Sequence, residues 1–125
     1  MNIGSSISVV VPVFNEEENI CPLAQEIGSA LKGICDYEII FVNDCSTDDT
    51  VVTLTKLKNE ISEIRVIHHS QRSGQSAGLR TGILAAKNNI IVTLDGDGQN
   101  DPADIPSLLK KYEQILYIIK STNHA

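Results

Sequence analysis

The sequence predicts a Rossmann-like α/β fold of three layers, in which helices cover both faces of a mainly parallel sheet. Two observations support this prediction. Short apolar runs rich in β-branched residues alternate four times with stretches whose apolar residues recur at helical spacing. Each apolar run also ends in polar residues, as expected where parallel strands deliver side chains to one edge of a sheet. We therefore expect right-handed crossovers and a single domain over residues 1–125.

The first two strands are predicted at 7–14 and 37–42. Asn15 follows the first strand and is expected to cap the first helix. Ser46 and Asp49 follow the second strand with the spacing of a capping box. The apolar residues expected to face inward from the two helices are Ile20, Leu23, Ala24, Ile27, Leu31, Val51, Leu54, Leu57 and Ile61.

The next two strands are predicted at 64–69 and 90–94, and the second of these is expected to be buried on both faces. Gly78 and Gly82 should let the intervening helix approach the sheet closely. The segment 115–125 either prolongs the last helix or begins another strand. The residues expected to face inward from these two helices are Leu79, Ile83, Ala86, Ile105, Leu108, Leu109 and Tyr112.

Composition and charge exclude several classes of function. With 42% hydrophobic and 21% charged residues, a chain of 125 residues can bury a core without disulfides. The net charge of −6 argues against nucleic-acid binding through phosphate contacts, which requires a basic face. A nucleotide can still bind through a metal ion and backbone N–H groups.

The cysteines and the apolar segments indicate the compartment. Cys21, Cys35 and Cys45 lack the spacing of metal ligands and are odd in number, which fits a reducing cytoplasm. The N-terminus does not resemble a secretion signal, and the apolar run at 115–119 is too short to span a bilayer. Any membrane contact is expected to be peripheral or to lie outside this chain.

The loop that follows the fourth predicted strand is acidic. Asp95 and Asp97 are two residues apart, so an extended backbone directs both side chains the same way, and Gly96 and Gly98 let the chain bend around a ligand. Two convergent carboxylates need a cation or a proton between them, and donors that are all oxygen favour Mg²⁺ or Mn²⁺. The alternative is a solvated turn that caps the next helix.

Three strand exits carry functional groups that should meet at one edge of the sheet: 14–16, 43–44 and 95–97. The first two can bind a base and a ribose, and the third, with its metal ion, a diphosphate. The dinucleotide fingerprint G-x-G-x-x-G and the phosphate loop G-x-x-x-x-G-K-[ST] are both absent. The pattern therefore favours a different class of nucleotide site.

Other polar residues near this edge have less specific interpretations. Arg72 and Arg80 can meet a phosphate, although a solvated surface role is an equal alternative for each. A structural role is expected for His68 and His69 because no metal-ligand spacing accompanies them. Cys45 has no histidine paired with it in the sequence and is interpreted as a small residue, not a nucleophile.

The segments 9–17, 40–50 and 95–102 resemble, in order, the three signature blocks of family 2 glycosyltransferases. The resemblance extends from about Ile7 to Glu113. The ending with Gln99 and Asp101-Pro102 is most similar to the dolichyl- or polyprenyl-phosphate mannosyl and glucosyl transferases.

This resemblance implies the donor-binding half of a GT-A fold and a metal-dependent enzyme, with Mg²⁺ or Mn²⁺ as cofactor. Such an enzyme moves a sugar from a nucleotide diphosphate sugar, of the GDP-mannose or UDP-glucose type, to a polyprenyl phosphate at the cytoplasmic membrane face. The residues implied in binding the nucleotide sugar are Pro12, Phe14, Glu16, Val42, Asp44, Ala77, Arg80 and Asp95. Those implied in binding the metal are Asp95, Asp97 and Gln99. No catalytic base is identified.

The sequence departs from the family in two respects. Asn43 and Cys45 stand where the family usually has an aspartate and a glycine. The family also continues into an acceptor-binding half, whereas this chain ends soon after its last predicted helix, so we expect a truncated catalytic domain. The alternative is a catalytically inactive nucleotide-binding or self-association module, for which a homodimer is the expected form.

Overall fold

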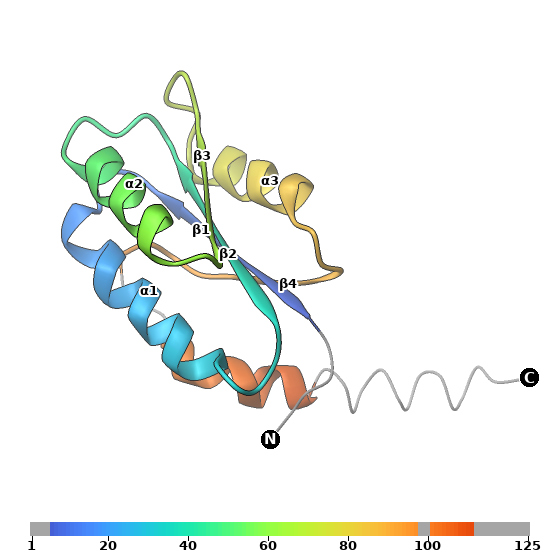
Figure 1. Ribbon diagram of the computed structural model, residues 1–125. Helices are drawn as coiled ribbons and strands as arrows, with labels where there is room; N and C mark the ends of the chain where they lie inside the picture. The colour runs from blue at the N-terminus through green and yellow to red at the C-terminus, as the bar shows by residue number, and fades with distance from the viewer. Residues whose placement is uncertain (1–5, 98–100, 112–125) are drawn as a thin grey trace, which may run out of the picture.

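The computed structural model describes residues 6–97 and 101–111. Strands and helices alternate along the chain as predicted (Figure 1). Residues 105–111 continue helically from the last element, a 3₁₀ turn. The elements are β1 (Ile7–Val13), α1 (Glu17–Leu31), β2 (Tyr37–Asn43), α2 (Thr50–Glu60), β3 (Ile64–His68), α3 (Gln75–Ala85), β4 (Ile90–Thr93) and η1 (Pro102–Asp104).

The four strands form one parallel sheet in the order β3-β2-β1-β4. Val9 of β1 lies opposite Ile39 of β2 and Val92 of β4, so β1 has a partner on both sides. Because the strands are parallel, all their carboxyl ends meet at one edge of the sheet. This confirms the predicted α/β fold and gives the strand exits a common location.

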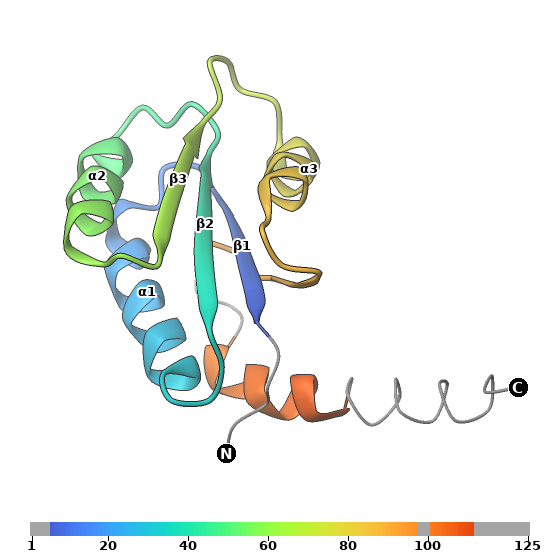
Figure 2. The same cartoon turned by 45° about the vertical axis from the view of Figure 1, so that its right-hand side comes forward.

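Helices cover both faces of the sheet, which makes three layers (Figure 2). The helices α1 and α2 lie on one face, and α3 lies on the other. Val9 and Val11 point into the core under α1 and α2, whereas Val10 points toward α3. Burial on both faces explains why β1 is an almost uninterrupted apolar run.

The predicted apolar face of α1 is confirmed, but its predicted cap is wrong. All five predicted inward residues of this helix are buried. Glu16 occupies the N-cap position and makes no side-chain capping bond. Asn15 instead directs its side chain across to the loop after β2, where Oδ1 accepts a hydrogen bond from the Thr47 backbone N at 2.8 Å.

The predicted capping box before α2 is also wrong. The Ser46 hydroxyl donates to Asn43 Oδ1 at 2.5 Å, and Asp48 Oδ1 accepts from the Thr50 backbone N at 3.0 Å. Asp49 occupies the N-cap position without a side-chain capping bond. The loop is therefore held by bonds that the spacing of its residues does not reveal.

Three apolar residues predicted to face inward are exposed: Val51 on α2, Ile83 on α3 and Leu108 in the final helix. On α3 the buried residues are the two glycines. A Cβ atom at Gly78 would lie 2.9 Å from Pro12 Cβ, and one at Gly82 would overlap Val10 Cγ1. Close approach of α3 to the sheet is thus confirmed. The buried residues of its inner face are small, and the predicted inward residue Leu79 packs beside them while only partly buried.

The prediction that the fourth strand is buried on both faces is wrong. Within the described part of the chain β4 lies at an edge of the sheet, and its apolar residues are only partly buried. An apolar run identifies a strand but does not fix its place in the sheet. Tyr112 and the segment 115–125 lie outside the described residues. No helix within 6–97 or 101–111 has the length and apolarity needed to cross a bilayer.

Candidate functional site

A cavity of about 460 Å³ opens at the carboxyl edge of the sheet. The exits of β1, β2 and β4 contribute to it, together with the loop between β3 and α3. Eleven described residues line it: Pro12, Val13, Phe14, Glu16, Asp44, Arg72, Gly74, Gln75, Asp95, Gly96 and Asp97. The structure therefore brings together six of the residues predicted to bind the nucleotide sugar or the metal.

The exit of β1 supplies an apolar wall followed by a carboxylate. Pro12 and Phe14 form the wall, and Glu16 begins α1. Asn15 turns the chain between them with φ of 52°. Its backbone N donates to Ser46 Oγ at 3.0 Å, and the Glu16 backbone N donates to Thr50 Oγ1 at 3.1 Å. These bonds fix the β1 exit against the β2 exit.

Asp44, at the exit of β2, is only 4% exposed and is surrounded by donors. Its Oδ1 accepts hydrogen bonds from His69 Nδ1 at 2.9 Å and from the Ser73 backbone N at 2.8 Å. Its Oδ2 accepts from the Gly74 backbone N at 2.8 Å. Burial alone would raise the pKa of Asp44, but these hydrogen bonds outweigh it and hold the pKa below its ordinary value of 3.8.

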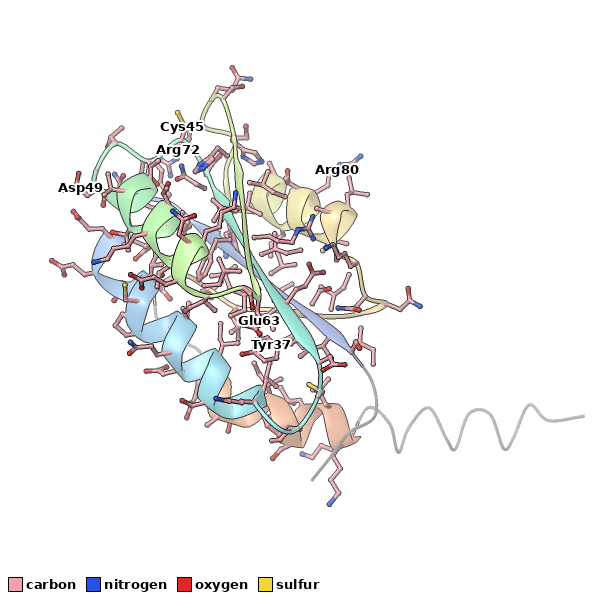
Figure 3. All side chains as sticks on the ribbon, viewed as in Figure 1. Tyr37, Cys45, Asp49, Glu63, Arg72 and Arg80 are labelled. Carbon is pink, nitrogen blue, oxygen red and sulfur yellow. The ribbon has the colours of Figure 1, made fainter. Side chains whose placement is uncertain are left out.

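Arg72 lies over the aromatic wall of the cavity. Its guanidinium carbon is 3.5 Å from the centre of the Phe14 ring, and its Nε is 3.6 Å from Asp44 Oδ2. The side chain remains 61% exposed, so it can shift to meet a ligand. Figure 3 shows Arg72 and Cys45 at this edge, whereas Arg80 lies apart from it on α3.

The loop after β4 brings two carboxylates to the cavity, Asp95 and Asp97. Gln75, the first residue of α3, donates from Nε2 to Asp95 Oδ1 at 2.7 Å. A Cβ atom at Gly96 would lie 2.8 Å from Val13 Cγ1, so glycine allows this loop to pass close to the β1 exit. The loop therefore contacts both the beginning of α3 and the end of β1 at the cavity.

The donor set suits a hard cation that is completed by its ligand. Asp95 and Asp97 provide carboxylate oxygens, and no group of three or more His, Cys, Asp or Glu residues within 6–97 and 101–111 is arranged so that it could hold a metal ion by itself. Mg²⁺ is commonly held by one or two carboxylates together with substrate phosphates and water. The residues present therefore fit a cation that arrives with a diphosphate.

The balance of charge leads to the same conclusion. Among the described lining residues, Arg72 is the only one with a positive charge, whereas four carry carboxylates: Glu16, Asp44, Asp95 and Asp97. Four carboxylates would repel a diphosphate, whereas a bound cation reverses the local charge. The cavity can thus bind a flat ring against Phe14. Its carboxylates can accept hydrogen bonds from hydroxyl groups of a ligand, and a diphosphate can bind beside a metal ion.

Three predicted residues do not line the cavity. Val42 is buried between the sheet and α3, Ala77 is half-buried on α3, and Arg80 is exposed on the same helix. Gln99 lies outside the described residues.

Sequence reasoning missed Gly74 and Gln75 as lining residues and His69 as the partner of Asp44. The signal that would have found them is their place at the carboxyl end of β3, on the same edge as the other three strand exits.

Comparison with known proteins identifies the family. Residues 8–122 match the sequence model of the family described as Glycosyl transferase family 2. Dodecaprenyl-phosphate galacturonate synthase of Rhizobium johnstonii is 39% identical over 110 residues, which are 86% of this chain and 32% of that protein. Undecaprenyl-phosphate 4-deoxy-4-formamido-L-arabinose transferase of Yersinia enterocolitica is 36% identical over 110 residues, with 86% and 34% covered.

A solved structure is similar over the same region. Glucosyl-3-phosphoglycerate synthase from Mycobacterium tuberculosis, in complex with Mn²⁺, uridine diphosphate and glucosyl-3-phosphoglycerate, superposes with a TM-score of 0.69 at 30% identity. The match covers 87% of this chain and 40% of that one. The chain thus spans about a third of the length of its curated relatives. With a family match over nearly its whole length and a parallel α/β sheet of the GT-A type, the chain belongs to glycosyl transferase family 2.

Proposed function

We propose that this chain is the donor-binding half of a glycosyltransferase that moves a sugar from a nucleotide diphosphate sugar to a polyprenyl phosphate. The observation that carries the proposal is the shared cavity, which is lined by the apolar wall of Pro12 and Phe14 at the β1 exit and by the Asp95 and Asp97 carboxylates at the β4 exit. A nucleoside diphosphate has a flat base at one end and two phosphates at the other. The cavity offers each end a matching surface.

The base and ribose bind at the β1 and β2 exits in this proposal. Pro12 and Phe14 contact the base, and Glu16 accepts hydrogen bonds from ribose hydroxyls. Asp44 supports this side with Val42 beneath it, and Arg72 can stack on the base or meet a phosphate. Further along α3, Ala77 and Arg80 are proposed to contact the nucleotide sugar.

The diphosphate binds at the other end with Mg²⁺ or Mn²⁺. Asp95, Asp97 and Gln99 are proposed to hold this cation, which, when bound, neutralises the charge that develops on the departing diphosphate. Asp95 also faces the ribose. A structural relative at 30% identity was solved with Mn²⁺ and uridine diphosphate, which supports this choice of ligands.

The acceptor is proposed from the relatives. The galacturonate synthase and the formamido-arabinose transferase are named for dodecaprenyl and undecaprenyl phosphate. A phosphate acceptor is already ionised at neutral pH, so it does not need a strong base to activate it. The reaction would take place at the cytoplasmic membrane face, with a donor of the GDP-mannose or UDP-glucose type.

Calorimetric titration with UDP and with GDP, each with Mn²⁺ and with a chelator, tests the proposal. We expect one nucleotide to bind in the presence of Mn²⁺ and to bind much more weakly with the chelator. The Asp97→Ala variant should lose the metal-dependent part of the affinity. The matched control is Asp36→Ala, which removes an exposed aspartate at the opposite edge of the sheet.

Failure of the folded wild-type chain to bind either nucleotide would contradict the donor-site proposal. That result would favour the alternative function, a self-association module. Sedimentation at several concentrations would then detect a homodimer.

A further inference from the structure

His69 connects the carboxylate of Asp44 with helix α3. Its Nδ1 pairs with Asp44 Oδ1 at 2.9 Å, and its Nε2 pairs with Thr81 Oγ1 at 2.8 Å. A carboxylate only accepts, so Nδ1 carries the proton, and Nε2 meets a hydroxyl that can donate or accept. With both ring nitrogens bonded and only 14% of the side chain exposed, the ring is held in one orientation.

Asp44 in turn holds the loop 70–74, which lies between β3 and α3 (Figure 2). The backbone N–H groups of Ser73 and Gly74 both point to its carboxylate, each at 2.8 Å. Arg72, the residue before them, lies over Phe14. A carboxylate whose two oxygens accept three hydrogen bonds from this loop and from His69 is suited to organising the loop.

We propose that His69 is a positioning residue of the nucleotide site: through Asp44 it fixes the loop 70–74, and thereby the place of Arg72 over Phe14. This inference rests on the proposed function, because it assigns Arg72 to nucleotide binding. It concerns the arrangement of the site, not the reacting atoms. Thr81 completes the arrangement by holding the second ring nitrogen from α3.

Two substitutions separate the bonds that His69 makes. Asparagine places an amide donor where Nδ1 lies, whereas glutamine places its amide near Nε2 and leaves Asp44 without that donor. We expect His69→Gln to weaken binding of UDP or GDP, whichever the wild type binds, by at least about tenfold, and His69→Asn to retain most of the affinity. Equal losses in the two variants would overturn the proposal.

The neighbouring histidine supplies a matched control. His68 is exposed, and its Nδ1 pairs with the Asn43 side chain at 3.0 Å, outside the lining of the cavity. His68→Gln should leave the affinity for the nucleotide unchanged. A loss as large as that of His69→Gln would assign the effect to the fold of this strand end and would overturn the proposal.

A double-mutant cycle distinguishes positioning from general destabilisation. If His69 acts through the place of Arg72, His69→Gln should have little further effect on nucleotide affinity once Arg72→Ala is present. Additive losses would show that the two residues act separately, which contradicts the proposal.

Amide hydrogen exchange tests, in the absence of nucleotide, whether His69 holds the loop 70–74. The Ser73 and Gly74 amides should exchange at least about tenfold faster in His69→Gln than in the wild type. Unchanged exchange would overturn the inference. If the wild type binds neither nucleotide, the proposed function fails and the assignment of Arg72 fails with it, while faster exchange would still support control of the loop by His69.

Discussion

Asn15 and Cys45 both have left-handed backbone, with φ of 52° and 60°, at neighbouring strand exits. The side chain of Asn15 has a use there, because Oδ1 accepts from the backbone N atoms of Thr47 and Asp48. Cys45 is exposed, and its Sγ lies 3.9 Å from the Ser70 carbonyl oxygen, which is a weak contact. Side-chain hydrogen bonds therefore offset the energetic cost of left-handed backbone at Asn15 but not at Cys45.

We expect Cys45→Gly to stabilise the protein by about 1 kcal/mol. Left-handed backbone costs a residue with a Cβ atom about 1–2 kcal/mol, and the greater freedom of glycine in the unfolded chain offsets part of that gain. Urea unfolding of the two proteins, with equal m-values, measures the difference.

Asn15→Gly is the contrasting variant. It removes the same backbone strain but also the hydrogen bonds that Asn15 Oδ1 accepts from the backbone N atoms of Thr47 and Asp48 and from the Thr47 hydroxyl, so it should destabilise the protein by about 1 kcal/mol. If both glycine variants changed stability in the same direction, backbone strain at Cys45 would not be the reason.

Sequence reasoning could predict the edge on which the site residues meet. Phe14, Asp44 and Asp95 follow apolar runs, and parallel strands bring such exits together. It could not assign the partners of Asp44. These donors come from the loop 70–74 and from His69, whose positions depend on tertiary hydrogen bonds and follow no periodic pattern.

At the level of elements, two glycines determine how closely α3 packs on the sheet. Gly78 lies against Pro12 and Gly82 against Val10, so the helix backbone comes close to β1. This close approach puts the beginning of α3, with Gln75, at the cavity. Packing of this helix therefore also positions one wall of the site.

We expect Gly82→Ala to destabilise the protein, by up to about 2 kcal/mol. Overpacking a core costs about 1–3 kcal/mol, which exceeds the gain of up to about 1 kcal/mol from alanine's helix propensity. Adding Val10→Ala should relieve the overlap, so the two substitutions should be less than additive in urea unfolding.

Gly28→Ala in α1 supplies the control. A Cβ atom at Gly28 would lie 3.5 Å from Tyr37 Oη, an ordinary contact, so only helix propensity changes and stability should rise by about 0.5–1 kcal/mol. A similar gain for Gly82→Ala would contradict the close approach of α3 to β1.

The two glycines also explain which helix faces could be predicted. On α1 the buried residues are large and recur every three or four positions, so the pattern located its inward face. On α3 glycines occupy the inner face, and Ile83 lies on the exposed side. A pattern based on large apolar residues locates this face only in part, through Leu79, which packs partly buried beside the glycines.

On the scale of the whole molecule, one buried carboxylate links several strands at the edge of the sheet opposite the cavity. Glu38 of β2 is 7% exposed. Its Oε1 pairs with Arg65 Nη1 of β3 at 2.7 Å, and its Oε2 accepts from Ser8 Oγ of β1 at 2.6 Å and from the Lys87 backbone N at 2.7 Å. Two strands and the connection from α3 to β4 thus meet at this residue.

The number and direction of the strands could be predicted from the sequence, but the interactions of Glu38 could not. Glu38 and Arg65 each lie within a predicted strand as single charged residues among apolar ones. Their pairing requires β2 and β3 to be neighbours, with Arg65 opposite Ile40 in the register. Apolar patterning fixes the face of a residue but not the neighbour of its strand.

The pH dependence of stability should reflect Glu38. Burial alone would raise the pKa of Glu38, but the Ser8 hydroxyl, the Lys87 backbone N–H and Arg65 hold it below its ordinary value of 4.5. A lowered folded-state pKa stabilises the protein above the unfolded value, and that contribution is lost as the pH falls through the folded-state pKa. The contribution of Glu38 is therefore full at neutral pH and disappears in acid.

We expect Glu38→Gln to reduce the free energy of unfolding by about 1–3 kcal/mol at neutral pH, because an amide donor would face groups that themselves donate. The deficit should shrink as the pH falls below about 4.5, since the wild type then loses the contribution that the variant never had. Urea unfolding of both proteins over a series of pH values measures the difference. Glu60→Gln, an exposed substitution at the end of α2, should follow the wild type throughout. A deficit that stays constant into acid would mean that Glu38 stabilises the sheet through its packing alone and not through its charge.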